Sequence, residues 1–118
     1  MNDTYGHKAR DLVIIGIADI IRENVKDVDT VARWGGEEFI AVLPYSNKDQ
    51  GLIVAQRILE RVSAHKFEQF TDRCITVSIG VSYLSPSLET KEKLIEAADS
   101  ALYEAKRKGR NRIECCTL

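Results

Sequence analysis

The amino-acid sequence predicts one domain of the α/β class, an α+β sandwich in which helices cover a mainly antiparallel sheet. Three observations support this prediction. The 118 residues suffice for one domain with a real hydrophobic core, and not for two. Hydrophobic residues make up 44% of the chain and charged residues 30%, which is typical of globular rather than disordered proteins. Helical and strand patterns follow one another as α-β-β-α-β-α-β, so that one pair of strands is joined directly.

The first predicted helix spans residues 8–26, where the apolar residues are so numerous that much of the helix surface is expected to be buried. Residues 1–7 are expected to form a turn. Two short apolar segments follow at residues 29–34 and 38–44, and a glycine pair at 35–36 separates them. This arrangement is typical of a β-hairpin with a tight turn, because glycine readily adopts the positive φ angles that such a turn requires.

The second predicted helix spans residues 48–64. Ser46 and Asn47 precede it, and their side chains can accept hydrogen bonds from the first N–H groups of a helix. One face of this helix is apolar and is expected to pack on the sheet. The residues of that face are Leu52, Ala55, Ile58, Leu59 and Val62.

The clearest strand pattern lies at residues 74–81, where polar and apolar side chains alternate. Pro86 marks a loop, and a third helix is predicted over residues 91–108. Gly109 suits the C-terminal cap of this helix, and residues 112–116 complete the chain as a short strand.

Charge and cysteine content exclude several classes of function. The formal net charge of −1 gives no overall field that would attract nucleic acid or an anionic membrane. No apolar segment is long enough to cross a bilayer, and no signal-peptide pattern begins the chain. Cys74, Cys115 and Cys116 are odd in number and lack C-x-x-C spacing, which favours neither disulfides nor a zinc site. The expected location is the cytoplasm, without contact to nucleic acid or membrane by this domain.

Two acidic residues, Glu37 and Glu38, directly follow the glycine pair of the predicted hairpin. A backbone without side chains can come close to a bulky, charged ligand, and neighbouring carboxylates can hold a hard cation through oxygen atoms. The pattern therefore suggests the binding of a nucleotide together with Mg²⁺. An ordinary hairpin with hydrated acidic residues remains an equal alternative on this segment alone.

Several motifs together make the whole chain similar to the GGDEF domain family of diguanylate cyclases, with Glu37 at the third position of the signature. They occur in the order and spacing of that family, and jointly they are highly specific. The matching segments are residues 2–7 with Asp11, residues 31–34, the signature Gly35-Gly36-Glu37-Glu38-Phe39, and residues 76–81, 98–106 and 109–111.

The resemblance implies a ferredoxin-like core related to adenylyl cyclases and polymerase palm domains. It also implies that two GTP molecules are joined into cyclic di-GMP, with release of two pyrophosphates and with Mg²⁺ (or Mn²⁺) as cofactor. Each subunit of a homodimer would hold one GTP, so that the two half-sites face each other. The parent protein would carry a sensory domain, and the GGDEF domain would be cytoplasmic even where the parent is anchored to a membrane.

The resemblance also assigns nucleotide-binding residues. Asn2 and Asp11 would recognise the guanine base, although a turn-forming Asn and a first-turn Asp are equally good interpretations without the family match. Lys106 and Arg110 would hold the triphosphate, and they share a helix face if the helix continues through Gly109. Basic residues also suit a helix C-terminus, which could account for part of this cluster.

The same resemblance gives the signature residues their roles. Gly35 and Gly36 would let the backbone approach the GTP phosphates. Glu37 would be the metal ligand and the base for the ribose 3′-hydroxyl, and Glu38 a second catalytic acid. Strict strand alternation would point these two carboxylates to opposite faces, so both serve one site only if the turn interrupts the alternation.

The sequence departs from the family pattern at its beginning. Members of the family begin with a central strand that carries an Asp-x-Asp-Phe-Lys-like segment just before the position of Asn2, and this chain starts after it. We therefore expect residues 1–118 to be an N-terminally truncated GGDEF-like domain with little or no cyclase activity of its own. Its unpaired strand edges would favour pairing between chains. The alternative is a catalytically silent module that binds GTP or cyclic di-GMP for regulation or dimerisation.

A second departure concerns the product-inhibition site found in many members. Its Arg-x-x-Asp motif corresponds here to Lys26 and Asp29, and Arg57 matches a secondary position. Lysine lacks the planar fork with which arginine binds a phosphate or a guanine edge, so this site is expected to be degenerate. Lys26 is equally interpreted as an ordinary surface residue.

Overall fold

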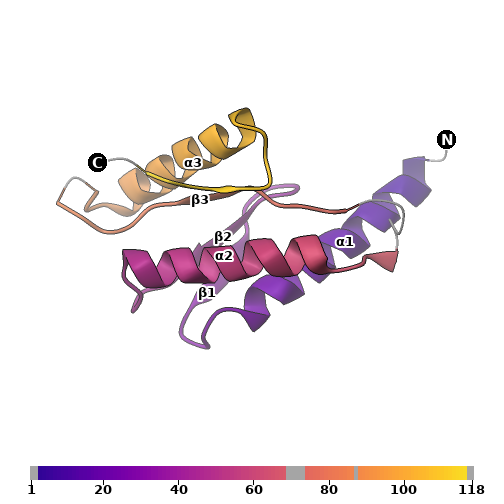
Figure 1. Cartoon of the computed structure of the whole chain (residues 1–118), viewed down its shortest axis with the longest axis horizontal. Helices are drawn as coiled ribbons and strands as arrows, with labels where there is room; N and C mark the ends of the chain where they lie inside the picture. Colours follow the sequence, from indigo (N-terminus) through magenta and orange to yellow (C-terminus); the bar gives the residue numbers. More distant parts are fainter. Residues whose placement is uncertain (1–2, 69–73, 87, 117–118) are drawn as a thin grey trace.

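The computed structural model describes residues 3–68, 74–86 and 88–116, and it confirms the α/β class and the order of the elements (Figure 1). In chain order these are α1 (Asp3–Glu23), β1 (Thr30–Arg33), β2 (Phe39–Val42), α2 (Lys48–Ala64), β3 (Ile79–Val81), α3 (Lys91–Arg107) and β4 (Ile113–Cys115).

Helix α1 begins earlier than the sequence pattern predicts. The structure has helical backbone from Asp3, so the expected turn at residues 1–7 is wrong over its described part. An acidic residue is favourable in the first turn of a helix, because the positive end of the helix dipole lies there. Periodicity missed this turn of helix, since it carries no apolar stripe.

Helix α1 also ends earlier than predicted, at Glu23 rather than at residue 26. The side-chain amide of Asn24 donates to the carbonyl oxygen of Ile20 at 2.7 Å. The N–H of Lys26 then donates to the Asp29 carboxylate at 2.8 Å, and the N–H of Asp29 donates to the carbonyl oxygen of Lys26 at 2.9 Å. These side-chain-assisted bonds compete with helix continuation and turn the chain into β1.

The predicted hairpin is confirmed, since β1 and β2 pair antiparallel with Thr30 opposite Val42 and Arg33 opposite Phe39. Its turn differs from the prediction. Residues 34–38, called the glycine loop below, connect the strands, and neither glycine in this loop has a positive φ. The prediction of a tight turn is wrong, because the chain reverses its direction over five residues and ordinary backbone angles can close such a loop.

Helix α2 begins as its sequence predicts. The side chain of Asn47 accepts from the N–H of Gln50 at 2.9 Å, and the Gln50 side chain accepts from the N–H of Asn47 at 2.9 Å. This reciprocal capping box satisfies two N–H groups that have no partner within the helix. The inward side chains include Ala55, Ile58 and Val62, all buried.

The strand predicted over residues 74–81 is confirmed only at Ile79–Val81, where it pairs in parallel with β4. Ile75 and Val77 still pack on the core, so the alternation of this segment is correct. Residues 74–78 have no partner strand among the described residues, and a strand requires one. The sheet is accordingly in two parts, the antiparallel pair β1–β2 and the parallel pair β3–β4.

Helix α3 lies very close to β3, and Gly80 makes this approach possible. A Cβ atom at position 80 would overlap the carbonyl oxygen of Ala98 and the backbone of Leu102. On the helix side, Ala101 and Ala105 are the buried residues, and both are small. The β3–β4 pair therefore lies between α3 on one face and α2 on the other (Figure 1).

The chain leaves α3 through a Schellman motif. The N–H of Arg110 donates to the carbonyl oxygen of Ala105 at 2.9 Å, and the N–H of Gly109 donates to that of Lys106 at 3.4 Å. Gly109 has a φ of 121°, a conformation that favours glycine, so its predicted capping role is confirmed.

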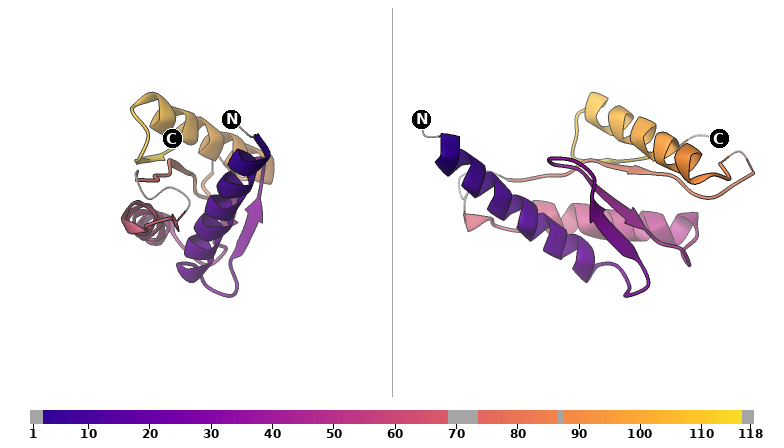
Figure 2. Two further views of the ribbon diagram at one scale, coloured as in Figure 1. Left: turned by 90° about the vertical axis from the view of Figure 1, so that its right-hand side faces the viewer. Right: turned by 180° about the vertical axis from the view of Figure 1, so that it is seen from behind.

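The hydrophobic core joins α1, α2, the hairpin and the segment before β3. Figure 2 shows the arrangement of these elements from two further sides. Burial on α1 is limited to one stripe, and Leu12 and Ile15 on its other side are 44% and 56% exposed. Much of this helix surface is thus not buried, contrary to expectation. The buried residues of this core cluster are Val13, Ile20, Ile21, Ile58, Val62 and Phe67.

Among the described residues, no helix has the length and apolar character needed to cross a membrane.

Candidate functional site

Two segments that are distant in sequence meet at the candidate site, namely the glycine loop and the C-terminal end of α3. The ammonium nitrogen of Lys106 lies 3.8 Å from a carboxylate oxygen of Glu38. Both side chains keep more than 40% of their surface exposed, so this contact stabilises the fold little. Its importance is geometric, because it brings the acidic loop and the basic helix end to one surface.

The two glycines of the loop are not required by packing or by backbone geometry. Neither Gly35 nor Gly36 has a positive φ, and an added Cβ at either position would meet no atom within 4 Å. The backbone at these positions is open to solvent. Glycine at these two positions leaves the main chain open to close approach from outside.

Glu37 and Glu38 both precede β2, which begins at Phe39, so the alternation of a strand does not apply to them. Glu37 is exposed, and Glu38 is half-buried beside Lys106. Residues 3–68, 74–86 and 88–116 contain no group of three or more His, Cys, Asp or Glu side chains that could hold a metal ion. Two carboxylates fit Mg²⁺ when most of its ligands are phosphate oxygens and water, which is its usual mode in nucleotide sites.

Three of the five basic residues in residues 106–112 pair with acidic residues of α3 or β4. Arg107 binds Glu104 at 2.8 Å, Lys108 binds Glu114 at 2.6 Å, and Arg112 lies 3.8 Å from Glu114. The hydrogen bond from Arg107 lowers the pKa of the Glu104 carboxyl, and that from Lys108 lowers the pKa of Glu114. These ion pairs connect residues of α3, β4 and the turn between them.

Lys106 and Arg110 are the remaining cations of this cluster. Within the described part of the chain, Arg110 forms no ion pair, and Lys106 has only the long contact to Glu38. The condition for a shared helix face, continuation of the helix through Gly109, is not met, because α3 ends at Arg107 and the chain turns at Gly109. Arg110 itself has a φ of 62° and projects from the turn after the helix.

The predicted guanine-recognition residues are not joined to this surface by any described contact. Asn2 lies outside the described residues. Asp11 is exposed on α1, and no hydrogen bond or ion pair connects it to the glycine loop in the described segments.

The predicted product-inhibition residues lie at a separate, small concavity. A cavity of about 220 Å³ is lined by Lys26 and Asp29, and Arg22 on the last turn of α1 joins them. Arg57, exposed on α2, is not among its lining residues. The structure thus brings together two of the three predicted residues and adds an arginine that the motif comparison did not select.

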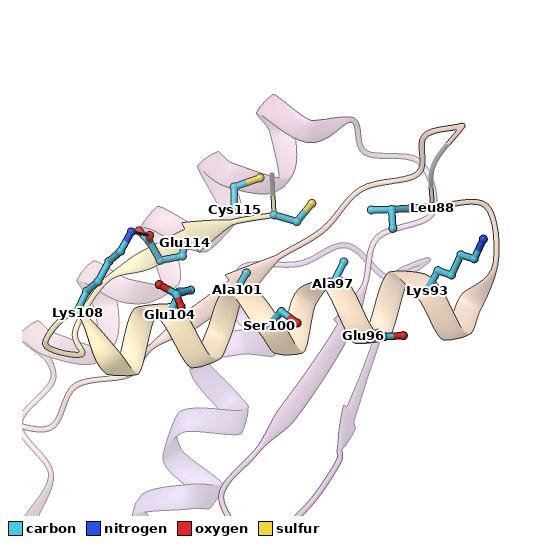
Figure 3. Close-up of a pocket in the computed structure, with 11 residues that line it drawn as sticks. Leu88, Lys93, Glu96, Ala97, Ser100, Ala101, Glu104, Lys108, Glu114 and Cys115 are labelled. Carbon is cyan, nitrogen blue, oxygen red and sulfur yellow. Dashed lines mark hydrogen bonds and ion pairs between the residues drawn. The ribbon is translucent and has the colours of Figure 1, made fainter. Parts of the chain in front are cut away.

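A larger groove of about 680 Å³ lies between α3 and β4, and Figure 3 shows its lining. None of the predicted site residues lines it. Cys115 and Cys116 border it, and burial raises the pKa of the Cys115 thiol, with the neighbouring Cys116 adding to this effect. A thiol with a raised pKa is a weak nucleophile near neutral pH, so the groove carries no evident chemistry.

Sequence reasoning missed one residue of the site. The Arg33 guanidinium donates hydrogen bonds to the carbonyl oxygens of both Gly35 and Gly36. The available signal was an arginine at the end of a predicted strand, two positions before a glycine pair.

Comparison with known proteins identifies the family of the chain. A family model described as "Diguanylate cyclase, GGDEF domain" matches residues 1–112. Diguanylate cyclase A of Treponema denticola is 42% identical over 114 residues, which are 96% of this chain and 31% of that protein. Diguanylate cyclase DosC of Escherichia coli K12 is 39% identical over 116 residues, 97% of this chain and 25% of that protein. The chain therefore spans less than a third of these curated relatives.

Solved structures give the same result. The active GGEEF domain of a diguanylate cyclase from Vibrio cholerae superposes with a TM-score of 0.89 at 34% identity, covering 99% of this chain and 74% of that one. The coiled coil and GGDEF domain of DgcB from Caulobacter crescentus, in complex with cyclic di-GMP, gives 0.87 at 32% identity, covering 98% and 62%.

Proposed function

The chain belongs to the GGDEF family of diguanylate cyclase domains, and from this premise we propose that it holds one GTP on the surface formed by the glycine loop and the end of α3. Two such domains would join their GTP molecules into cyclic di-GMP and release two pyrophosphates. One observation carries the proposal. The contact between Lys106 and Glu38 brings a cationic helix end and an acidic, glycine-rich loop together without contributing much to stability.

The phosphates would bind between these two segments. In the described residues, the N–H groups of Gly36 and Glu37 donate to no backbone acceptor, so both can donate to phosphate oxygens. Lys106 and Arg110 would neutralise the triphosphate. Lys106 already lies beside the glycine loop at Glu38, and Arg110 forms no ion pair within the described part of the chain. Asn2 and Asp11 remain the proposed guanine ligands.

Glu37 would hold Mg²⁺ (or Mn²⁺), with Glu38 as the second acid. When bound, such an ion would supply positive charge beside the phosphates and would make the 3′-hydroxyl more acidic. The exposed Glu37 carboxylate can also accept the proton of the ribose 3′-hydroxyl. Glu38 keeps Lys106 beside the loop until the triphosphate takes that place.

The surface is open rather than enclosed, since Trp34, Glu37 and Arg110 are all exposed. An open half-site suits a homodimer in which a second GTP-bearing surface closes it, so we propose a homodimer as the active form. We further propose that the full-length parent is a cytoplasmic signalling protein with a sensory domain.

The proposal is tested by incubating the chain with GTP and Mg²⁺ and measuring cyclic di-GMP and pyrophosphate. GTP binding is measured in parallel by the fluorescence of Trp34, the single tryptophan, which is 59% exposed within the glycine loop. Cyclic di-GMP formation supports the cyclase. Binding without turnover by this chain is followed by the same assay on the full-length parent, where turnover supports the cyclase and its absence supports the silent module. A chain that neither binds nor converts GTP contradicts both.

Replacing Lys106 with glutamine should separate binding from stability. The contact with Glu38 is long and solvent-exposed, so the free energy of unfolding should change by less than about 1 kcal/mol. GTP affinity should fall about tenfold, because one charge-assisted phosphate contact is lost. Urea unfolding and GTP titration measure the two effects, and Lys66→Gln at an exposed loop position serves as the control. A loss of stability without a loss of affinity would assign Lys106 to the fold.

Replacing Lys26 with arginine should strengthen cyclic di-GMP binding at the small cavity beside Asp29. Arginine would supply the planar fork that lysine lacks, and we expect a gain in affinity of about tenfold. Isothermal titration with cyclic di-GMP measures the gain, with Lys66→Arg as the matched control. An unchanged dissociation constant would identify Lys26 as an ordinary surface residue.

A further inference from the structure

We infer that Arg33 is a positioning residue that fixes the conformation of the glycine loop for nucleotide binding. The inference rests on the proposed function for its consequence, while its structural basis is independent of any ligand. It concerns a side chain that would organise the loop without touching the substrate.

The guanidinium group of Arg33 donates several hydrogen bonds to the glycine loop. The Nε of Arg33 donates to the carbonyl oxygen of Gly35 at 3.3 Å and to that of Gly36 at 3.2 Å, and Nη2 donates to the Gly36 oxygen as well. Within the described chain, Arg33 forms no ion pair with an acidic residue. Its charge is directed at the two carbonyl groups of the loop.

The hydrogen bonds from Arg33 determine which backbone groups of the glycine loop can face a ligand. Carbonyl oxygens repel phosphate, whereas N–H groups attract it. By holding the oxygens of Gly35 and Gly36 on its own side, Arg33 keeps them from turning toward the proposed phosphate site. The N–H groups of Gly36 and Glu37, which have no described backbone acceptor, can then face the ligand.

The geometry suits arginine better than lysine. The N–H groups of Trp34 and Gly35 both donate to the carbonyl oxygen of Glu38, but among the described residues no backbone donor holds the carbonyl oxygens of Gly35 and Gly36, which Arg33 binds. A planar guanidinium can bind two neighbouring carbonyl groups at once, while an ammonium group is a single point charge. Arg33 also lies at the end of β1, where its backbone is fixed by pairing with Phe39.

The test compares Arg33→Lys and Arg33→Gln with the parent chain, and Arg61→Lys at an exposed position on α2 serves as the charge-conserving control. Backbone ¹⁵N relaxation is measured for residues 35–37 without ligand. We expect order parameters near about 0.85 in the parent chain and in the control, and below about 0.6 in both Arg33 variants. The urea midpoint should remain unchanged in all four proteins, which separates loop order from global stability.

GTP affinity is then measured with Mg²⁺ through Trp34 fluorescence. Both Arg33 variants should bind about tenfold more weakly, corresponding to one lost ordering interaction of about 1.4 kcal/mol. Unchanged order parameters would overturn the inference, and so would normal affinity in Arg33→Lys with loss only in Arg33→Gln, since charge alone would then suffice. If the loop loosens but the parent chain binds no GTP, the restraint by Arg33 stands and the proposed function fails.

Discussion

Replacing Gly80 with alanine should abolish the native fold or lower its free energy of unfolding by about 3 kcal/mol or more. The added Cβ would overlap the carbonyl oxygen of Ala98 and the backbone of Leu102, and neither group can rotate away. Relief would require α3 to separate from β3, which would expose Ala101 and Ala105. Urea unfolding followed by circular dichroism measures the loss.

The matched control for this substitution is Gly51→Ala. Gly51 lies in α2, where an added Cβ would meet no atom within 4 Å. Alanine is favoured over glycine inside a helix, so this variant should gain about 0.5–1 kcal/mol. Equal stability of the two variants would show that α3 does not approach β3 as closely as the structure indicates.

In the full-length parent, replacing Glu37 with glutamine should lower the rate of cyclic di-GMP formation by about 100-fold or more, because a charge that would hold the metal and accept a proton is removed. The Mg²⁺ dependence of GTP affinity should disappear at the same time. The free energy of unfolding should not change, since the Glu37 side chain is exposed. Product formation and GTP titrations with and without Mg²⁺ measure these effects.

Glu89→Gln, at an exposed position before α3, controls for the loss of one negative charge elsewhere. It should leave turnover, GTP affinity and the Mg²⁺ dependence unchanged. If Glu37→Gln behaves like this control, Glu38 rather than Glu37 would be the principal acid of the site.

Features that depend on local chemistry could be predicted from the sequence. Asn47 and Gln50 lie three residues apart, and their capping box depends on nothing outside that turn. Gly109 follows a helical pattern, and its left-handed backbone needs no tertiary partner. Periodicity placed α2 and α3 for the same reason, because each presents its own apolar face.

Features that depend on a partner could not be predicted in the same way. Residues 74–78 have the alternation of a strand, but hydrogen bonding decides whether they form one. The glycine pair suggested positive φ angles, whereas the structure uses these glycines in a longer loop with ordinary backbone. A pair of glycines shows only that many backbone conformations are allowed, and the surrounding structure decides which of them is adopted.

The candidate site was predicted in part. The acidic loop and the basic end of α3 were selected from the sequence, and the contact between Glu38 and Lys106 places them together. Lys106 and Arg110 could share a helix face only if the helix continued through Gly109, and this condition is not met because α3 ends at Arg107. Arg33 was not selected, because every residue has a backbone carbonyl and a hydrogen bond to one cannot be recognised from the residue types.

Because the sheet is divided into the pairs β1–β2 and β3–β4, the molecule can open between these two pairs. Among the described residues no backbone hydrogen bond crosses from β2 to β3, so side-chain contacts, including that of Lys106 with Glu38, hold the hairpin half against the half that contains α3. Such packing yields more readily than a continuous ladder when a protein fluctuates. The glycine loop belongs to one half and Lys106 to the other. A triphosphate bound between them would act as a crosslink across this seam, so that occupancy and rigidity of the domain would rise together.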